Sequence, residues 1–503
     1  MSPKPPHTSA WLLSLSAACA AATSIDCGSA GSVPVPDAGP TYGQLGDESS
    51  VAWTTPFGAS SVTPAAVAAA PDGTVRIAAT LRGTVTLGGT TLATAGGQDV
   101  LVAELGANGE PLWAHDYGDS LDQSASDAVV DAAGNVIVVG TFAGTLDFQS
   151  SVAPTVQSVA LTPSAATPGT AAMVAAGASD AFVAKLDAGG SLVWSTRLGS
   201  AGTTTEARSV ALGANGAIAL TGGLRHGLVP KAPAGAADSD VFVALLDAGG
   251  HLQWTKSFGG GGTDVGTSVA ANAQGELAVT GTYQGAIDFG AGALPTFGQS
   301  DVFLAKLDAQ GSLEWTKASG GPTADDAVGV AFDPSGDVIT LGNYSGAVSS
   351  DAPLAGAATS AAGRMLLLKY DPAGSSLWTD RFGSGDPREQ STALAVDGQG
   401  NAYVAGQVHA SFDFGACNLA PTSADQTGQA FVVMTTAAGQ ATCGQRYGLG
   451  AAAQIVSLAV APVRGVVMTG VVEGPIDLGQ GTITGNPAAG FVAREEPIPQ
   501  PLL

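Results

Sequence analysis

The chain has few charged residues for its length, and basic residues are the scarcest. Of its 503 residues 12% are charged, and 18 Lys and Arg stand against 42 Asp and Glu, for a net charge of −24. No cluster of Lys and Arg exists that could grip a phosphate backbone, so nucleic acid is not an expected partner. Apolar residues still make up 45% of the chain, which excludes a disordered protein. We therefore expect a folded, acidic protein.

Long hydrophobic runs are also missing beyond the amino terminus. Residues 1–22 carry Lys4 and then an apolar stretch from Trp11 to Ala22, which predicts a secretory signal peptide. No later segment has about 18 uninterrupted apolar residues, so no transmembrane helix is expected. Residues 23–50 are rich in Ser, Gly and Pro and predict a flexible stalk. These features predict an exported protein, either extracellular or at the outer surface or in the periplasm.

Cysteine and histidine are too few and too scattered to predict a zinc site, and no CxxC motif occurs. Cys19 lies in the signal region and could carry a lipid anchor, although Ser16 stands where a lipobox has Leu. Cys417 and Cys443 lie 26 residues apart. In an oxidising compartment they could form a disulfide, and the alternative is two buried thiols.

A repeated segment organises the rest of the chain. It occurs as DAFVAKLDAGGSLVWSTRLG from Asp180, DVFVALLDAGGHLQWTKSFG from Asp240 and DVFLAKLDAQGSLEWTKASG from Asp301. Six of the seven Trp occupy one position of this unit, at residues 53, 113, 194, 254, 315 and 378, and Cys443 takes that position in a further copy. A period of about 60 residues indicates a repeat architecture.

Each unit predicts two β-hairpins and hence four strands, which we call A to D. In one unit A is SVAAN, B is LAVTG, C is DVFLAKLD and D is LEWTKASG, with Gly-containing tight turns between A and B and between C and D. Such units arranged around an axis form an all-β propeller. The A–B hairpins number seven, with turn glycines at 73, 134, 216, 275, 336, 400 and 465.

The two chain ends complete the count of seven blades. Residues 51–58 read as a D strand without a preceding C strand, and residues 490–496 read as a C strand without a following D strand. Pairing them would close the ring and remove two exposed sheet edges. We therefore predict a seven-bladed propeller over residues 51–496, followed by a tail at 497–503.

The repeated DAFVAKLD, GxxxW, FGG, SIAVD, NVYVTG and DFG-type elements resemble the SBBP-type β-propeller repeat of bacterial exported proteins. The resemblance covers about residues 51–496 and implies architecture and export rather than an activity. The unit with Cys443 in place of Trp departs from it, and so does the third unit, which has HGLVPKAPAG instead of the DFG element.

One face of the propeller is the expected binding face. The A–B and C–D turns are short, whereas the B–C loops on the opposite face, which also carries the D–A connections, vary in length, as recognition loops do. Acidic residues recur on that face just before strand A. Their carboxylates could form a ring that binds Ca²⁺, or they could cap turns; they are Asp122, Glu206, Asp264, Asp325, Asp326 and Glu389.

Two further recurrent residue types have structural interpretations. The aspartates of the DFG-type element, Asp147, Asp288, Asp413 and Asp477, predict hydrogen bonds to turn amides, with metal ligation as the alternative. The repeated Trp residues predict packing between blades, with sugar stacking as the alternative.

No residue pattern identifies a catalytic site: GxSxG and HExxH motifs are missing. We expect a monomeric, non-enzymatic binding or scaffold module at the cell exterior that recognises a protein or a glycan. The alternatives are a quinoprotein-like oxidoreductase that binds pyrroloquinoline quinone and a carboxylate-based enzyme acting on glycans. The period near 60, the seven blades and the scarcity of basic residues for a tricarboxylate cofactor argue against the quinoprotein.

Overall fold

The computed structural model describes residues 51–59, 61–148, 155–159, 167–169, 172–226, 239–350, 364–414, 417–419, 428–442, 444–447, 452–461, 465–477 and 482–495. The predicted signal peptide (1–22), stalk (23–50) and tail (497–503) lie outside these ranges. Within them, no helix is long and apolar enough to span a membrane. The fold belongs to the unit from Tyr42 to Leu503.

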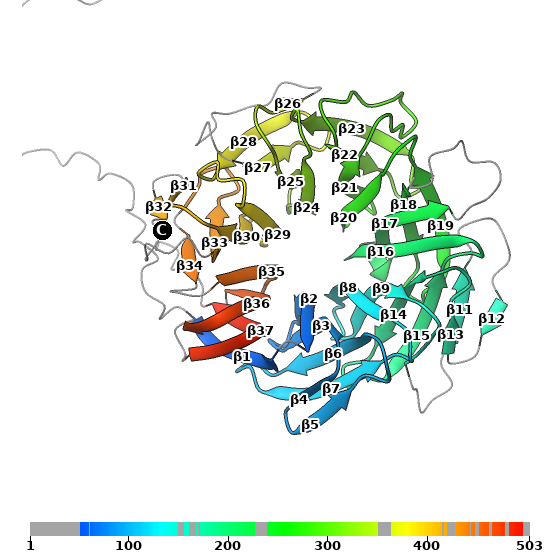
Figure 1. Ribbon diagram of the computed structural model, residues 1–503. Coiled ribbons are helices and arrows are strands. Elements are labelled where there is room, and N and C mark those ends of the chain that lie inside the picture. The colour runs from blue at the N-terminus through cyan, green and yellow to red at the C-terminus, as the bar shows by residue number, and fades with distance from the viewer. Residues whose placement is uncertain are drawn as a thin grey trace, which may run out of the picture. The chain divides into compact units, whose positions relative to one another are not determined.

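Seven blades, each with a core of four antiparallel strands, surround a central axis, so the predicted seven-bladed propeller is confirmed (Figure 1). Within each core of four strands, strand A is innermost and strand D lies on the outside; further strands pair with strand D in blade 2 (β11, Thr155–Val159, then β12, Thr167–Gly169) and in blade 4 (β26, Ser349–Ser350). Blade 1 consists of β2 (Val62–Ala69), β3 (Val75–Leu81), β6 (Asp99–Leu105) and β7 (Pro111–Tyr117). Blade 2 consists of β8 (Gln123–Val130), β9 (Val136–Phe142), β14 (Asp180–Leu186) and β15 (Leu192–Leu198). Blade 3 consists of β16 (Thr203–Leu212), β17 (Ile218–His226), β18 (Ser239–Leu246) and β19 (Leu252–Phe258).

The next three blades repeat this order, and the last blade combines both chain ends. Blade 4 consists of β20 (Val265–Ala271), β21 (Leu277–Tyr283), β22 (Asp301–Leu307) and β23 (Leu313–Gly320). Blade 5 consists of β24 (Asp326–Phe332), β25 (Val338–Asn343), β27 (Met365–Tyr370) and β28 (Ser376–Phe382). Blade 6 consists of β29 (Gln390–Val396), β30 (Ala402–Val408), β33 (Gln429–Thr435) and β34 (Gln445–Tyr447). Blade 7 consists of β35 (Ala452–Val460), β36 (Val466–Asp477), β37 (Thr482–Glu495) and β1 (Val51–Ala59).

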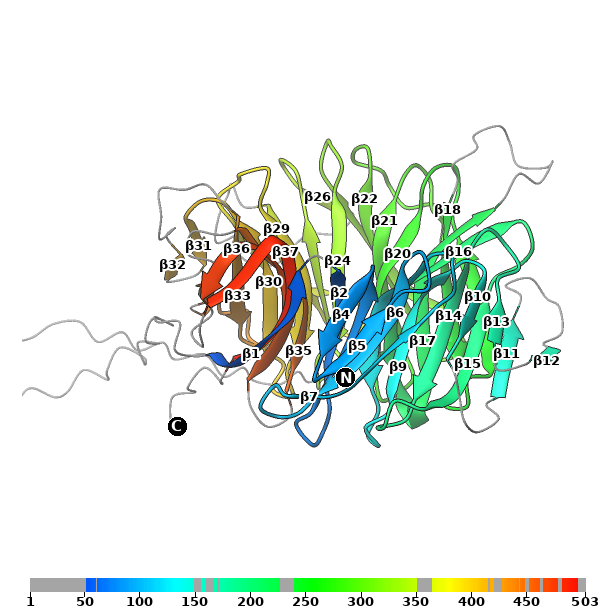
Figure 2. The ribbon, with the colours of Figure 1, turned by 60° about the horizontal axis from the view of Figure 1, so that its bottom comes forward.

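The closure of the ring by the two chain ends is confirmed. Strand β1 pairs antiparallel with β37, with Val51 opposite Glu495 and Thr55 opposite Val492. In Figure 2 the blue β1 lies beside the red β37. The amino-terminal strand is therefore the outer strand of blade 7, and ladder hydrogen bonds rather than a covalent link hold the ring shut.

The hydrophobic core is divided among the joints between blades. The sheets lie face to face, and strands B and C are buried along nearly their whole length, as in β6, β22 and β33. Seven clusters of buried apolar side chains result, each shared by two neighbouring blades. Strands buried on both sides need apolar residues throughout, which accounts for the low charge of the chain.

The tight turns follow the expected chemistry. All seven predicted A–B turn glycines have positive φ, from 65° at Gly465 to 87° at Gly73, a conformation that favours glycine. In the C–D turn of blade 2, Oδ1 of Asp187 accepts hydrogen bonds from the amides of Gly189 (2.9 Å) and Ser191 (2.8 Å). The same two amide contacts recur in the C–D turns of blades 3, 4 and 5, at Asp247, Asp308 and Asp371.

Each of the six repeated Trp side chains docks its blade onto the next. The indole Nε1 donates to a carbonyl oxygen in the following C–D turn, for example from Trp194 to Ala248 at 3.1 Å and from Trp254 to Ala309 at 3.0 Å. The ring also lies against the glycine of that turn, such as Gly250 beneath Trp194. The predicted packing between blades is confirmed.

Every innermost strand contains a β-bulge at the same place, which the sequence did not reveal. Register shifts occur between residues 64 and 66, 125 and 127, 207 and 209, 266 and 268, 327 and 329, 391 and 393, and 455 and 457. The side chain after the bulge can accept an amide hydrogen bond from the next blade, as Asp127 does from Val210 (3.0 Å) and Ser209 does from Val269 (3.3 Å).

Several B–C connections hold strands of their own. Blade 1 has the hairpin β4 (Thr84–Leu87) and β5 (Thr90–Ala93), and in blade 7 the β36–β37 ladder continues to Asp477 opposite Thr482. The remaining ones are β10 (Thr145–Asp147), β11 (Thr155–Val159), β12 (Thr167–Gly169), β13 (Ala172–Val174), β26 (Ser349–Ser350), β31 (Phe412–Phe414) and β32 (Cys417–Leu419). Parts of this face are therefore built from ordered hairpins rather than irregular loops.

Candidate binding sites on the two faces of the propeller

On the loop face, the predicted acidic residues Asp264 and Asp325 connect the D–A and B–C connections of their blades. Both are fully buried. The carboxylate of Asp264 accepts the amides of Gly260 and Gln284, each at 3.0 Å. Asp325 accepts the amides of Gly321 and, at 2.8 Å, Ser345. The turn-capping interpretation is confirmed for these two residues, although they are buried rather than solvated, and burial raises the pKa of Asp325.

The other predicted acidic residues of this face make separate local contacts. Asp122 accepts the amide of Gln98 at 3.0 Å, Glu206 lies 3.5 Å from Arg208, and Glu389 accepts the amide of Ser384 at 2.8 Å. Burial raises the pKa of Glu389. Asp326 is the exposed first residue of β24.

No three His, Cys, Asp or Glu side chains within the described ranges lie together as a metal site would require. Ca²⁺ binding by the predicted ring stays a prediction.

Two further predicted sets are described only in part. Oδ1 of Asp288 accepts the amides of Gly290 (2.7 Å) and Gly292 (2.9 Å), which confirms its predicted turn role. The side chains of Asp413 and Asp477 lie outside the described residues, and so do Cys443 and the side chain of Cys417. The disulfide between these two cysteines stays a prediction.

The turn face, opposite to the predicted binding face, carries a cavity of about 610 Å³. It lies where the A–B turns of blades 4, 5 and 6 meet, with the C–D turn of blade 5 at its side. Its apolar wall comprises Phe332, Pro334, Pro372 and Val396, and its polar groups include Asn272, Gln274, Glu276, Asp333, Ser335 and Asp397. A cavity of this size and mixed lining is in the usual range for small-molecule sites.

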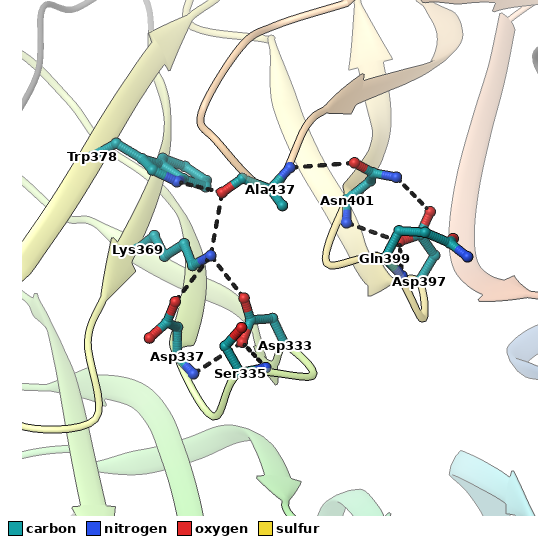
Figure 3. A network of polar contacts seen from close by, with 9 residues as sticks. All are labelled: Asp333, Ser335, Asp337, Lys369, Trp378, Asp397, Gln399, Asn401 and Ala437. Carbon is teal, nitrogen blue, oxygen red and sulfur yellow. Dashed lines mark hydrogen bonds and ion pairs between the residues drawn. The ribbon is translucent and has the colours of Figure 1, made fainter. Parts of the chain in front are cut away.

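Buried lysines from strand C stabilise two of these acidic turns. Lys369 contacts Asp333 at 2.7 Å and Asp337 at 3.1 Å, and it also donates to the carbonyl oxygen of Ala437 at 3.2 Å. Trp378 donates to the same carbonyl, as Figure 3 shows. Burial alone would lower the pKa of Lys369, but the two carboxylates raise it. This network ties the turns of blade 5 to those of blade 6.

Blade 4 has an equivalent arrangement. Lys306 lies 3.0 Å from Glu276 and 2.8 Å from Glu314, and it donates to the carbonyl of Pro372 at 3.2 Å. Burial alone would raise the pKa of Glu276, but the contacts with Asn272 and Lys306 lower it. The carboxylate of Glu276 is therefore ionised at neutral pH, at one edge of the cavity.

Two repeated residue types in the sequence mark the acidic turns of this face. The lysine of the recurrent AKLD segment and the acidic residue that opens the A–B turn are both repeated. Their contact joins strand C to the A–B turn of the same blade, so it follows only once the strand order within the blade is known.

No family model matches the chain. A 160-residue stretch, 30% of the chain, is 28% identical to regulatory protein FlaEY of Caulobacter vibrioides, and it spans only 16% of that protein's length. Among solved structures, the chain resembles a PL25 ulvan lyase, a polysaccharide lyase, with 12% identity and a TM-score of 0.43, covering 86% of this chain and 97% of the lyase. A puromycin hydrolase gives 14% identity and a TM-score of 0.33, covering 82% and 58%.

Proposed function

We propose that this protein is an exported, non-enzymatic β-propeller of the SBBP type that serves as a binding or scaffold module at the cell exterior. It recognises a protein or a glycan through the B–C and D–A connections. The observation that supports this proposal is the difference between the two faces of one rigid ring. Six joints carry the same Trp contact. The B–C connections, in contrast, differ from blade to blade in length and in the strands they contain.

Such a division suits recognition. A scaffold whose blades are locked to one another holds its loops in fixed positions, which reduces the entropy lost when a ligand binds. Function in proteins is concentrated on loops held by rigid elements. The hairpins β4–β5 and β36–β37 present ordered backbone on this face.

A binding screen against glycans and surface proteins tests the proposal. The intact protein is compared with a variant in which residues 475–484, the distal part of the β36–β37 hairpin beyond the Gly474–Gly485 pair, are replaced by a two-residue turn. The Asp131→Asn variant, altered on the opposite face, is the control. We expect a ligand that binds the intact protein and the control but binds the shortened variant more weakly.

Equal binding by all three proteins, or no ligand at all, would contradict the proposal. Cleavage of a bound glycan, or the absorbance of a bound quinone in the purified protein, would replace it with one of the two enzymatic alternatives.

A further inference from the structure

Three A–B turns open with an aspartate that makes the same hydrogen bonds. In blade 2, Oδ1 of Asp131 accepts the amides of Ala133 and Asn135, both at 2.9 Å. Asp333 in blade 5 and Asp397 in blade 6 each accept the amides two and four residues later. The three carboxylates are therefore held in equivalent positions by equivalent turns.

Two of these three carboxylates have an ammonium group as partner, and it comes from one position of strand C. Lys185 lies 2.8 Å from Asp131, and Lys369 lies 2.7 Å from Asp333. Within its sheet, Lys185 pairs with Ile137 and Lys369 pairs with Ile339, the second residue of each strand B. The repeat thus supplies an internal cation to the acidic turn of its own blade.

Blade 6 keeps the acid but lacks this cation. The residue that pairs with Tyr403, at the register position of the lysines, is the buried Met434. Within the ranges that the structure describes, Asp397 receives only neutral donors: the amides of Gln399 and Asn401, Nδ2 of Asn401 at 2.8 Å and the hydroxyl of Tyr403 at 3.4 Å. Figure 3 shows Asp397 with Asn401 and Gln399 beside the lysine-containing network of blade 5.

Asp397 is only 9% exposed and lines the 610 Å³ cavity. The apolar wall of Phe332, Pro334, Pro372 and Val396 lines the same cavity. A largely buried carboxylate is most stable beside an opposite charge, and the apolar wall could cover a short hydrocarbon stem. The cavity therefore offers both parts of the environment that a lysine side chain finds inside blades 2 and 5.

The surrounding charges favour a cation as well. Lys306 is shared by Glu276 and Glu314, and Lys369 is shared by Asp333 and Asp337. Of these carboxylates, Glu276 and Asp333 line the cavity together with Asp397, whereas neither lysine is among its lining residues. An anionic ligand would meet this excess of negative charge, whereas a cation would be attracted.

We propose that this cavity binds a primary ammonium group on an apolar stem, with Asp397 as its counter-ion in place of the lysine that blade 6 lacks. The ammonium can belong to a lysine side chain of a partner or to a small free amine. This site lies on the turn face, so it is independent of the proposed loop-face recognition and can fail or succeed separately from it.

Ligand-observed NMR on the intact protein tests the site with defined probes. They are n-butylamine as the free amine, a blocked lysine peptide as the protein-derived source, and the same peptide acetylated on Nζ as the uncharged control. We expect saturation transfer to the two charged probes, weakening with added salt, and little to the acetylated peptide. Whichever charged probe binds more tightly identifies the source of the ligand.

Two variants and a matched control make the test specific. Asp397→Asn should weaken binding roughly tenfold or more, because a charge-assisted hydrogen bond is lost. The turn itself should persist, because Asn272 already holds the equivalent turn of blade 4 through the amides of Gln274 and Glu276. Asp131→Asn makes the same change in blade 2 and should leave binding unaltered.

The second variant restores the internal cation. Met434→Lys should supply blade 6 with the ammonium group found in blades 2 and 5, and so should abolish binding of both charged probes. Binding of the acetylated peptide as tight as that of the charged one would overturn the proposal. So would undiminished binding by Asp397→Asn or Met434→Lys, or no binding of either charged probe.

Discussion

The indole nitrogen of Trp53, in the outer strand of blade 7, donates a 2.8 Å hydrogen bond to the carbonyl oxygen of Ala107 in the C–D turn of blade 1. Trp53 thereby docks blade 7 onto blade 1, in the same way as the other repeated Trp residues dock their blades onto the next one. Within the described residues the joint between blades 6 and 7 has no equivalent acceptor, because strands C and D of blade 7 come from opposite chain ends and no C–D turn joins them. In the sequence, Cys443 stands at the Trp position of the repeat unit.

The Trp contacts should contribute strongly to stability. Trp194 is 4% exposed, so we expect Trp194→Ala to lower the free energy of unfolding by about 3–5 kcal/mol. Trp194→Phe keeps the ring but loses the hydrogen bond, and it should cost about 1 kcal/mol. Urea denaturation measures both. Val193→Ala in the same strand is the control, because Val193 is exposed; an equal cost for Val193→Ala would contradict the docking role.

Ring closure should depend on β37. Removal of residues 490–503 deletes the part of β37 that pairs with β1 from Val51 to Pro56. It should expose the edges of β1 and β36, with loss of cooperative unfolding and of solubility. Removal of residues 497–503 alone leaves β37 complete and serves as the control. Unchanged thermal unfolding of the longer deletion would show that the closure contributes nothing.

The buried Lys369 should stabilise the folded protein by neutralising its acidic partners. Lys369→Met leaves Asp333, whose side chain is 3% exposed, without its cation and should cost about 3 kcal/mol. Adding Asp333→Asn removes the unpaired charge, so the double variant should be more stable than Lys369→Met alone. Urea denaturation of the wild type, the two single variants Lys369→Met and Asp333→Asn, and the double variant gives the coupling energy between the two residues. Additive costs would argue against a direct interaction.

Asp127 should make stability depend on pH. Burial raises the pKa of Asp127 to about 6, although hydrogen bonds from Val210 and Ala128 lower it in part. The folded state therefore holds the proton of Asp127 more tightly than the unfolded chain does. The stabilisation that protonated Asp127 gives the folded state is complete below about pH 4 and is lost as pH rises through 6. Between pH 4 and 7.5, the free energy of unfolding should fall by about 2 kcal/mol more in the wild type than in Asp127→Asn. Parallel pH profiles would contradict this.

Glu495, in blade 7, should also make the protein less stable as pH rises. It is 4% exposed in β37, and burial raises its pKa to about 7. Its contribution is therefore present below about pH 4.5 and is lost as pH rises through 7. Glu495→Gln should remain more stable than wild type at pH 8 but not at pH 4.5, as thermal unfolding would show. A variant equally destabilised at both values would indicate a packing role instead.

Calorimetry checks the predicted Ca²⁺ ring. Ligation by Asp122, Glu206, Asp264, Asp325 and Glu389 predicts that Ca²⁺ raises the melting temperature and that a chelator reverses the rise. A melting temperature that does not respond to Ca²⁺ would leave these acids with their structural contacts alone.

The sequence by itself determined the architecture, because the turn Gly and the docking Trp recur in the same order, mostly about 60 residues apart. Alternation and turn chemistry are local, so the seven hairpins could be counted, and the unpaired strands at the two ends predicted the closure. The packing role of Trp194 and the turn role of Asp288 followed from their repetition. Local patterns of this kind need no knowledge of neighbouring blades.

Only the tertiary structure decided where charges and cavities lie. Whether Asp397 has a cation depends on strand C of the same blade, more than thirty residues later, and on the register that places Met434 beside Tyr403. The cavity forms where three blades converge near the axis, and Phe332 and Pro372 line it although neither belongs to a binding motif. Such contacts depend on how the sheets twist and pack around the axis, which a periodic sequence does not encode locally. For that reason the loop lengths indicate one face of the propeller, whereas the cavity lies on the other.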